Sequence, residues 1–225
     1  MNKKLKIIVA AVLIMVVGFS AVLLSWGEPT SQLQKTELKS SENNNGTNSL
    51  GFNDISGTTW VLQSNDNSSA ELGFVIDGDL KETKGFFEKF DIVFKVAENQ
   101  TDNAKIKVVI DVASINTENS IRDKALMDED FFNFEKFPTI SYFSKNIIKK
   151  EGDYITSGVI EMMGLKSELS FVFIHKGISV NKNNIKVAIF EGEMEIDRTL
   201  FGMSHTPSVG DIVKLNFYCE LVEKI

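Results

Sequence analysis

The chain has 225 residues, and its 31 acidic and 24 basic side chains give a formal net charge of −7 at pH 7. Because an acidic surface is repelled by phosphate backbones, this balance argues against a nucleic-acid partner. The only cysteine is Cys219, so a disulfide within the chain is excluded.

Residues 1–27 have the composition of a targeting segment. Lys3, Lys4 and Lys6 precede an uncharged apolar run from Ile7 to Trp26, which is the order of a secretory signal or a signal-anchor helix. The run is long for a cleaved signal and close to the ~20 residues that a helix needs to cross a bilayer, so cleavage and anchoring both stay open. We expect export to the periplasm or cell envelope, with attachment to the cytoplasmic membrane if the segment is kept.

Residues 28–55 are rich in Ser, Asn, Thr, Glu and Lys, as in the stretch SSENNNGTNS that begins at Ser40. Such a polar segment buries too little apolar surface to offset the entropy of ordering, which predicts a disordered linker. Phe52 and the few leucines of this segment are interpreted as incidental. The remainder, residues 56–225, suits one domain with a sizeable core.

Apolar and polar residues alternate along much of residues 56–225. Phe90 to Val96, Lys105 to Val112 and Phe190 to Asp197 alternate with a period of two, which places the apolar set on one face of a half-buried strand. Further apolar runs, separated by turn signals, lie at 72–76, 140–143, 154–162, 169–175, 185–190 and 213–221. The pattern predicts an all-β domain of about eight or nine antiparallel strands.

One helical stretch interrupts the predicted strands. Residues 119–127 begin with Asn119, which can cap a helix, and continue with good helix formers. The sequence has no glycine-rich phosphate loop or internal repeat, and its two histidines, His175 and His205, are too few to argue for a metal site. We therefore expect no metal and no catalytic cofactor.

The last predicted strand favours a closed barrel over a sandwich. Its odd-numbered residues from Val213 to Leu221 are apolar, whereas the even-numbered ones are mostly polar, as in a wall with an apolar interior and a wetted exterior. A barrel of ~8 strands is either filled by its own side chains or encloses one small ligand. The residues predicted to point inward are Phe90, Ile92, Phe94, Ile106, Val108, Ile110, Leu215 and Phe217.

The stretch SINTENSIRDKALMDEDFFNFEKFPTISYFSK, from Ser114 to Lys145, resembles the signature of the YceI-like family of exported, lipocalin-like barrels that bind polyisoprenoid lipids. The shared features are a Ser-Ile-x-Thr start, an Arg-Asp pair, an acidic residue before two phenylalanines, and an aromatic-Pro-x-Ile end. Further matches lie at 60–62, 157–164, 196–202 and 209–211. Where the family has an Asp and a His-Ser shortly after the first tryptophan, this chain reads Gln63-Ser64-Asn65-Asp66-Asn67-Ser68-Ser69, so any ligand contact made by that histidine is missing.

The resemblance implies an extended lipocalin-like antiparallel β-barrel with a short inserted helix. Its apolar channel would hold an isoprenoid tail, from a polyprenyl lipid or a quinone, and the protein would carry or store that lipid in the bacterial cell envelope without catalysis. The residues expected to line the channel or its lid are Phe90, Phe94, Val108, Ile110, Phe131, Phe132, Phe171, Phe173 and Phe217. Arg122, Asp123 and Arg198 match family motif positions and are placed at the mouth, although such groups more often pair with each other or with backbone carbonyls.

Two alternatives stay open. An enzyme acting on isoprenoid lipids would need a set such as Ser204, His205 and Asp211, but no nucleophile-elbow sequence surrounds Ser204. A barrel filled by its own side chains would instead act as an interaction or envelope-stress protein. The sequence identifies neither the lipid nor the oligomeric state, and a homodimer stays open.

Overall fold

The computed structural model describes residues 52–63, 69–79, 81–98, 100–151, 153–203 and 209–224, together with Lys35 and Thr206. The predicted leader lies outside the described residues, as do Ser204, His205 and all of the predicted linker except Lys35 and residues 52–55. Among the helices within the described ranges, none has the length and apolar character that a membrane span requires.

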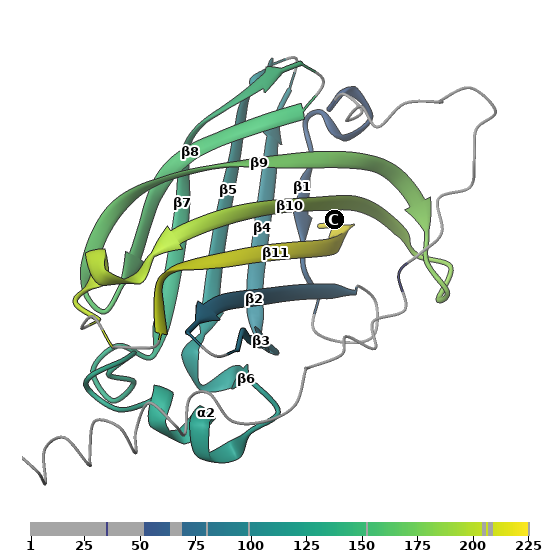
Figure 1. The fold of residues 1–225 in the computed structure, drawn as a ribbon. Helices are drawn as coiled ribbons and strands as arrows, with labels where there is room; N and C mark the ends of the chain where they lie inside the picture. Colours follow the sequence, from purple (N-terminus) through teal and green to yellow (C-terminus); the bar gives the residue numbers. More distant parts are fainter. Residues whose placement is uncertain are drawn as a thin grey trace, which may run out of the picture.

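Eight antiparallel strands close into a barrel (Figure 1). In order around the wall they are β1 (Thr59–Val61), β4 (Phe90–Ala97), β5 (Gln100–Asp111), β7 (Thr139–Lys150), β8 (Asp153–Met162), β9 (Leu165–Val180), β10 (Lys186–Asp197) and β11 (Val209–Glu223). The short strand β1 closes the wall because it pairs with β4 on one side and with the end of β11 on the other. The predicted all-β barrel of about eight strands is confirmed.

Three more strands extend the sheet along β11. They are β2 (Ala70–Gly78), β3 (Thr83–Phe87) and β6 (Ile115–Asn116), and each pairs with the one before it. The sequence pattern missed β3 and β6 because strands of 5 and 2 residues are too short to show a period. The predicted runs 185–190 and 190–197 form the single strand β10.

The predicted helix is confirmed as α2 (Ser120–Leu126). It begins at the expected cap, where the side-chain oxygen of Asn119 accepts hydrogen bonds from the backbone amides of Ile121 and Arg122, both at 3.1 Å. Three short 3₁₀ helices complete the described elements, namely η1 (Asn53–Ile55), η2 (Val112–Ser114) and η3 (Arg198–Phe201). Residues 127–138 connect α2 to β7 as a loop.

The two ends of the barrel are closed by different elements. One end, called the mouth below, carries α2, the loop 127–138, the β8–β9 turn and η3 (lower left in Figure 1). The other end, called the filled end below, carries β1, η1 and the turns that follow β7 and β9. Antiparallel pairing fixes this division, because Met162 pairs with Leu165 at the mouth while Lys150 pairs with Asp153 at the filled end.

Phe52 and Ile55 are fully buried in the core. The ring of Phe52 stacks on that of Tyr154 with 3.9 Å between centroids, and it meets Phe94 edge-on at 5.3 Å. The interpretation of Phe52 as an incidental linker residue is therefore wrong. A single apolar residue in a polar segment can still pack into a core when the chain folds back, so the packed domain includes residues before position 56.

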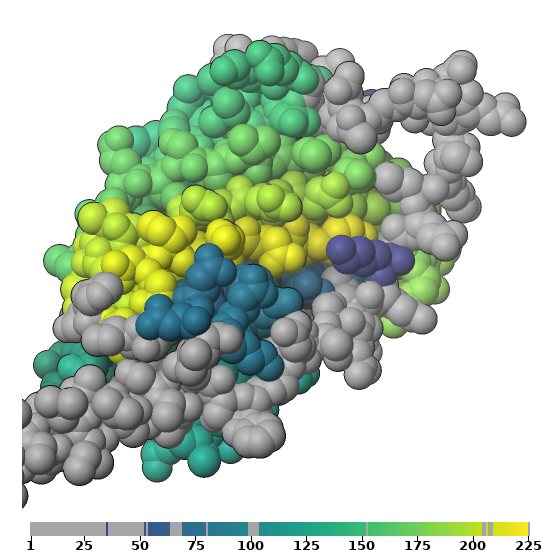
Figure 2. Space-filling view, viewed as in Figure 1, coloured from purple at the N-terminus to yellow at the C-terminus, as the bar shows by residue number. Residues whose placement is uncertain are grey.

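The prediction that the outer wall is exposed to solvent is wrong near the filled end. Tyr218 and Glu220 point outward from β11, yet they are only 6% and 0% exposed, and they lie beside the buried Val187 and Ile189 of β10. The Tyr218 hydroxyl donates to Glu220 at 2.8 Å, and the amine of Lys35 lies 4.7 Å above the Tyr218 ring. The predicted solvent-exposed exterior is wrong here. Alternation predicts on which face of a strand a residue lies, but it does not predict whether other residues cover that face. Figure 2 shows β9, β10 and β11 as one continuous wall on this side.

Candidate functional site

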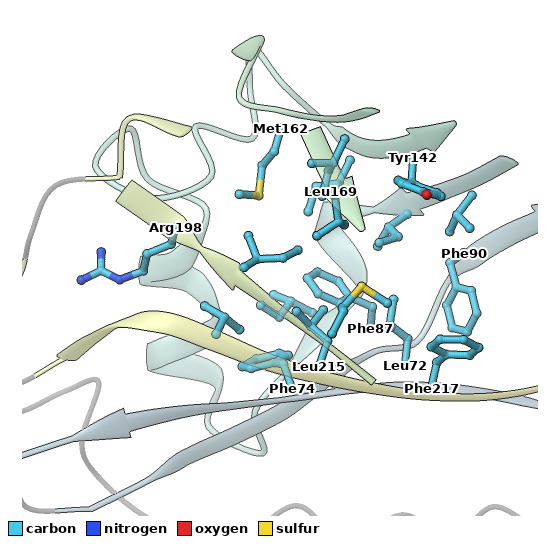
Figure 3. A pocket seen from close by; sticks show the side chains of 18 of the residues that line it. Leu72, Phe74, Phe87, Phe90, Tyr142, Met162, Leu169, Arg198, Leu215 and Phe217 are labelled. Carbon is cyan, nitrogen blue, oxygen red and sulfur yellow. The ribbon is translucent and has the colours of Figure 1, made fainter. Parts of the chain in front are cut away.

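The barrel encloses a cavity of about 210 Å³ between the filled end and the mouth. The cavity is lined by side chains of the barrel strands other than β1, of β2, β3 and β6, and of α2, the loop 127–138 and residues 198–203, and most of them are hydrocarbon (Figure 3). Among the described residues that line it, polar side chains are limited to Thr83, Arg122, Tyr142, Arg198 and the thiol of Cys219. Shape and apolar contact would therefore hold the contents of this cavity, rather than hydrogen bonds.

The residues predicted from alternation are found where they were expected. All eight predicted inward residues line the cavity, from Phe90 in β4 to Phe217 in β11, which confirms their orientation. The nine residues expected to line a channel also lie on its wall, namely Phe90, Phe94, Val108, Ile110, Phe131, Phe132, Phe171, Phe173 and Phe217. Their binding of a ligand stays a prediction.

The aromatic loop after α2 has two separate roles. Phe131 and Phe132 reach the cavity, whereas Phe134 packs against the core and does not line it. Phe137 lies against the β8–β9 turn, where a Cβ atom on Gly164 would come within 2.7 Å of its ring. Part of the loop therefore lines the cavity, and the rest anchors the loop to the barrel.

Two glycines on the inner face make room for rings of neighbouring strands. A Cβ atom on Gly192 would lie 2.7 Å from the ring of Phe217, and one on Gly158 would lie 2.8 Å from the ring of Tyr142. A glycine inside a strand can mark such a close approach, so the sequence did carry a signal for these contacts. Sequence reasoning also missed lining residues from β2, β3 and the methionines, namely Leu72, Phe74, Ile76, Phe87, Met162, Met194 and Met203.

Stacked rings end the cavity at the filled end. Phe94, Phe173 and Phe190 face the cavity, while Phe52, Tyr154 and His175 lie behind them and do not line it. Tyr154 stacks on Phe173 at 5.4 Å, and His175 stacks on Phe190 at 4.9 Å. We call these six rings the floor. They fill one end of the barrel, so the cavity can open only toward the mouth.

A buried polar pair lies between the floor and the cavity. The hydroxyl of Tyr142, which lines the cavity, is 2.8 Å from the hydroxyl of the fully buried Thr156. Burial raises the pKa of the Tyr142 phenol, and its hydrogen bond with Thr156 partly offsets that rise. The phenol is therefore neutral at ordinary pH, and the pair adds no charge to the cavity.

Arg122 and Asp123, both predicted at the mouth, are bonded to Thr117 just before α2. The guanidinium of Arg122 donates to the Thr117 hydroxyl at 2.8 Å and to its carbonyl at 2.7 Å, while the carboxylate of Asp123 accepts from the Thr117 amide at 2.9 Å. Burial lowers the pKa of Arg122, and the charge of Asp123 opposes that shift. These bonds hold α2 in place, and a ligand contact by either residue stays a prediction.

Arg198, the third predicted mouth residue, holds η3 to the start of β11. Its guanidinium donates to the carbonyls of Gly210 and Val209 at 2.8 and 3.2 Å and to Asp211 at 3.2 Å. Burial lowers the pKa of Arg198, while Asp211 and Asp197 raise it. Figure 3 shows the guanidinium directed away from the apolar side chains. A role in binding a ligand head group stays a prediction.

The described part of the site offers little reactive chemistry. No three His, Cys, Asp or Glu side chains of the described residues come together as a metal site requires. Burial raises the pKa of the Cys219 thiol to about 12, so the thiolate that acts as a nucleophile is scarce. Ser204 and His205, the residues of the enzyme alternative, lie outside the described residues.

Sequence comparisons identify relatives of this chain. A sequence model of the YceI-like domain matches residues 49–221. Over 82 residues the chain is 37% identical to a UPF0312 protein of Photorhabdus laumondii, a match that covers 36% of this chain and 42% of that protein. The chain spans about half the length of the curated relatives it matches.

Two solved structures share this fold. A mutant of the Campylobacter jejuni YceI protein is 26% identical, with a TM-score of 0.58 over 64% of this chain and 87% of that one. A polyisoprenoid binding domain from Saccharophagus degradans, implicated in plant cell wall breakdown, is 10% identical, with a TM-score of 0.54 over 74% of this chain and 99% of that one. At such low identity the second likeness shows the fold alone.

Proposed function

The chain belongs to the YceI-like family, and from this premise we propose that its barrel binds an isoprenoid lipid, such as a polyprenyl lipid or a quinone, and carries or stores it without chemical change. The observation that carries the proposal is the apolar cavity of about 210 Å³, closed at one end by the floor. The polyisoprenoid binding domain from Saccharophagus degradans, which shares the fold, supports it.

The cavity lining suits a prenyl tail in particular. Such a tail has no group that hydrogen-bonds, so it needs none of the placed polar groups that most ligand sites contain. Each Å² of apolar surface taken from water contributes ~25 cal/mol, which must exceed the cost of immobilising a flexible chain. The tail would point toward Phe94 and Phe173 of the floor, and the head group would lie near the mouth.

The cell envelope is the proposed location. The uncharged run from Ile7 to Trp26 after three lysines supports export, and a retained leader would place the barrel beside a membrane that contains isoprenoid lipids. The mostly hydrocarbon lining, in which the two arginines are bonded to groups of the protein itself, supports a carrier. The alternative of a barrel filled by its own side chains fits the filled end but not the cavity.

Mass spectrometry of an organic extract tests the proposal. Protein purified from its own cell envelope should carry a prenyl lipid in near-stoichiometric amount. Val108→Asp should abolish retention because it places a desolvated carboxylate against the tail. Val93→Asp is the matched control, since Val93 lies on the same strand pair but is 37% exposed on the outer wall.

Phe132→Ala provides a milder test at the mouth. Removing this ring should speed the release of the lipid while leaving the fold intact, as shown by circular dichroism. If folded Val108→Asp and Phe132→Ala proteins both retain as much prenyl lipid as the parent, then the tail does not occupy this cavity and the carrier function is refuted.

A further inference from the structure

The most exposed large apolar side chains of the described residues lie at the mouth. Ile121 in α2 is 67% exposed, Leu200 in η3 is 59% exposed, and Leu165 at the start of β9 is 48% exposed. They belong to three elements that are far apart in the sequence. Ile121 is the second residue of α2, Leu200 the third of η3 and Leu165 the first of β9, so all three belong to the elements at the mouth.

Contacts join these three elements into one rim. Phe137, in the loop after α2, packs against Gly164 in the β8–β9 turn. The next residue, Leu165, reaches toward η3, since its Cδ1 atom lies 3.7 Å from the place of a Cβ atom on Gly202. We call Ile121, Leu165 and Leu200 the mouth rim.

The mouth rim lies at the end of the barrel that the floor does not close. Leu126 and Arg198 line the cavity from α2 and η3, which carry two of the rim residues, and Met162 lines it from the end of β8, just before the turn that leads to Leu165. Because the floor closes the opposite end, apolar contents would enter and leave at the mouth. An apolar ligand that left through water would first expose its whole surface, at ~25 cal/mol per Å².

We propose that the mouth rim docks on the surface of a lipid bilayer, with Ile121, Leu165 and Leu200 inserted below the head groups, so that apolar cargo passes between bilayer and cavity without crossing water. The choice of a lipid surface as partner rests on the proposed function. The exposure of the three side chains does not depend on it.

Charge defines the kind of surface. Asp128, Glu129, Asp130 and Glu135 are exposed in the loop after α2. Lys124, Lys136 and Lys166 are exposed in α2, in the same loop and next to Leu165, so the rim carries no excess of positive charge. The whole chain has a net charge of −7. Acidic side chains next to the rim are repelled by anionic head groups and not by zwitterionic ones. The rim therefore suits a zwitterionic surface, and anionic lipids weaken docking at low salt.

A fluorescent label on the rim tests this proposal in the full-length protein. Leu200→Cys is labelled with a polarity-sensitive maleimide, since the native Cys219 is buried and its raised pKa of about 12 keeps it unreactive. Val172→Cys, at a residue that is 45% exposed on the outer wall of β9, is the matched control. The protein is then reconstituted in phosphatidylcholine vesicles and titrated with iodide.

With vesicles, iodide should quench the rim label about fivefold less than the wall label, because a group ~5–10 Å below the head groups is beyond the reach of an aqueous ion. Adding phosphatidylglycerol at low salt should reduce this protection, and high salt should restore it. Ile121→Ser with Leu165→Ser should abolish protection, whereas Phe143→Ser with Ile148→Ser, at wall residues that are 47% and 46% exposed, should not.

Three results would contradict the proposal that the mouth rim docks on a bilayer. These are equal quenching of the two labels, better protection of the wall label, and protection of the rim label without vesicles, which would mean that a second copy of the chain covers the rim. None of these results bears on the lipid extract described above, so a failure of the docking surface can be distinguished from a failure of the carrier function.

Discussion

The filled end and the mouth end of the barrel interior have linings of similar composition, rich in phenylalanine and aliphatic side chains, but only the filled end is packed. At the filled end, Phe52 stacks at 3.9 Å on Tyr154, and Phe173 of the floor lines the cavity while Phe52 and Tyr154 do not. Toward the mouth, rings such as Phe74 and Phe217 line a hollow of about 210 Å³. The apolar character of a wall therefore does not determine whether the space inside it is filled.

The segment that precedes β1 accounts for the difference. At the filled end β1 joins β4 to the last residues of β11 and closes the eight-stranded ring. Phe52 and Ile55 lie just before β1, and both are folded into that end and fully buried there. Nearer the mouth, β2 pairs with β11 in place of β1, and α2 and its loop lie across the end of the barrel.

Truncation of one buried residue at each end should reveal this difference most strongly. Phe52→Ala should lower the free energy of unfolding of lipid-free protein by about 3–5 kcal/mol, since it leaves a cavity inside a packed floor. Leu215→Ala should cost nearer 2 kcal/mol, because Leu215 already borders empty space and makes fewer contacts. Urea denaturation measures both values. Equal costs would show that the mouth end collapses in solution.

The reactivity of the Cys219 thiol should show whether water reaches the wall between the filled end and the mouth. Its pKa of about 12, against an ordinary value of 9.0, makes the thiolate ~1,000-fold scarcer at pH 8 than in the unfolded chain. Alkylation by iodoacetamide, followed by mass spectrometry, should slow by about that factor relative to protein in urea. A folded thiol that reacted as fast as the unfolded one would mean that water reaches this part of the wall.

The raised pKa of the Cys219 thiol should also make the free energy of unfolding depend on pH. Between pH 9 and about 12 the unfolded chain loses the Cys219 proton while the folded protein keeps it. The folded state therefore binds more protons in this window, and the free energy of unfolding should fall as pH rises through it. Cys219→Ala should remove that part of the alkaline loss, which a pH series of urea denaturations measures against the parent protein.

Arg198→Met should separate structural from ligand-binding roles at the mouth. The substitution removes hydrogen bonds to Gly210, Val209 and Asp211, so we expect a loss of about 1.5–3 kcal/mol in the free energy of unfolding. Lipid retention at temperatures where the protein stays folded should be unchanged. Lost retention at unchanged stability would instead assign Arg198 to the head group of the ligand.

Much of the wall could be predicted from the sequence because a strand has only two faces. A period of two was enough to place Phe90, Val108 and Leu215 inside, and a polar residue before a run of helix formers was enough to locate the cap of α2 at Asn119. The barrel itself followed from many short alternating runs and from the resemblance to a known signature. Whether the interior is filled depends on segments that fold back into it, such as Phe52 and Ile55, and local patterns do not contain that information.

The errors have a common physical origin. Phe52 lies in a polar segment, and only its contact with Tyr154, about a hundred residues later, makes it part of the core. Tyr218 and Glu220 follow the alternation of β11 correctly but are covered on the outside. Burial of these residues depends on tertiary contacts, so composition and period in a short window cannot show it.

The smallest expected effect concerns the polar pair between the floor and the cavity. Tyr142→Phe removes the phenol and leaves the fully buried Thr156 hydroxyl without this hydrogen bond, which should cost about 1–2 kcal/mol. Thr156→Val should cost a similar amount, because the Tyr142 phenol then loses the same bond. The double variant, with two apolar groups of nearly the same shape, should cost less than the sum of the two single changes.

A double-mutant cycle in urea therefore measures the coupling energy, with the sum of the single losses as its reference. Strong coupling would place the pair in the packed end, where no water replaces the lost partner. If both single changes are neutral, then water from the hollow end reaches Thr156 and the boundary lies deeper than Tyr142. Since Tyr142→Phe also makes the cavity wall more apolar, prenyl lipid should be retained at least as well. A loss of retention would instead show that the phenol itself contacts the ligand.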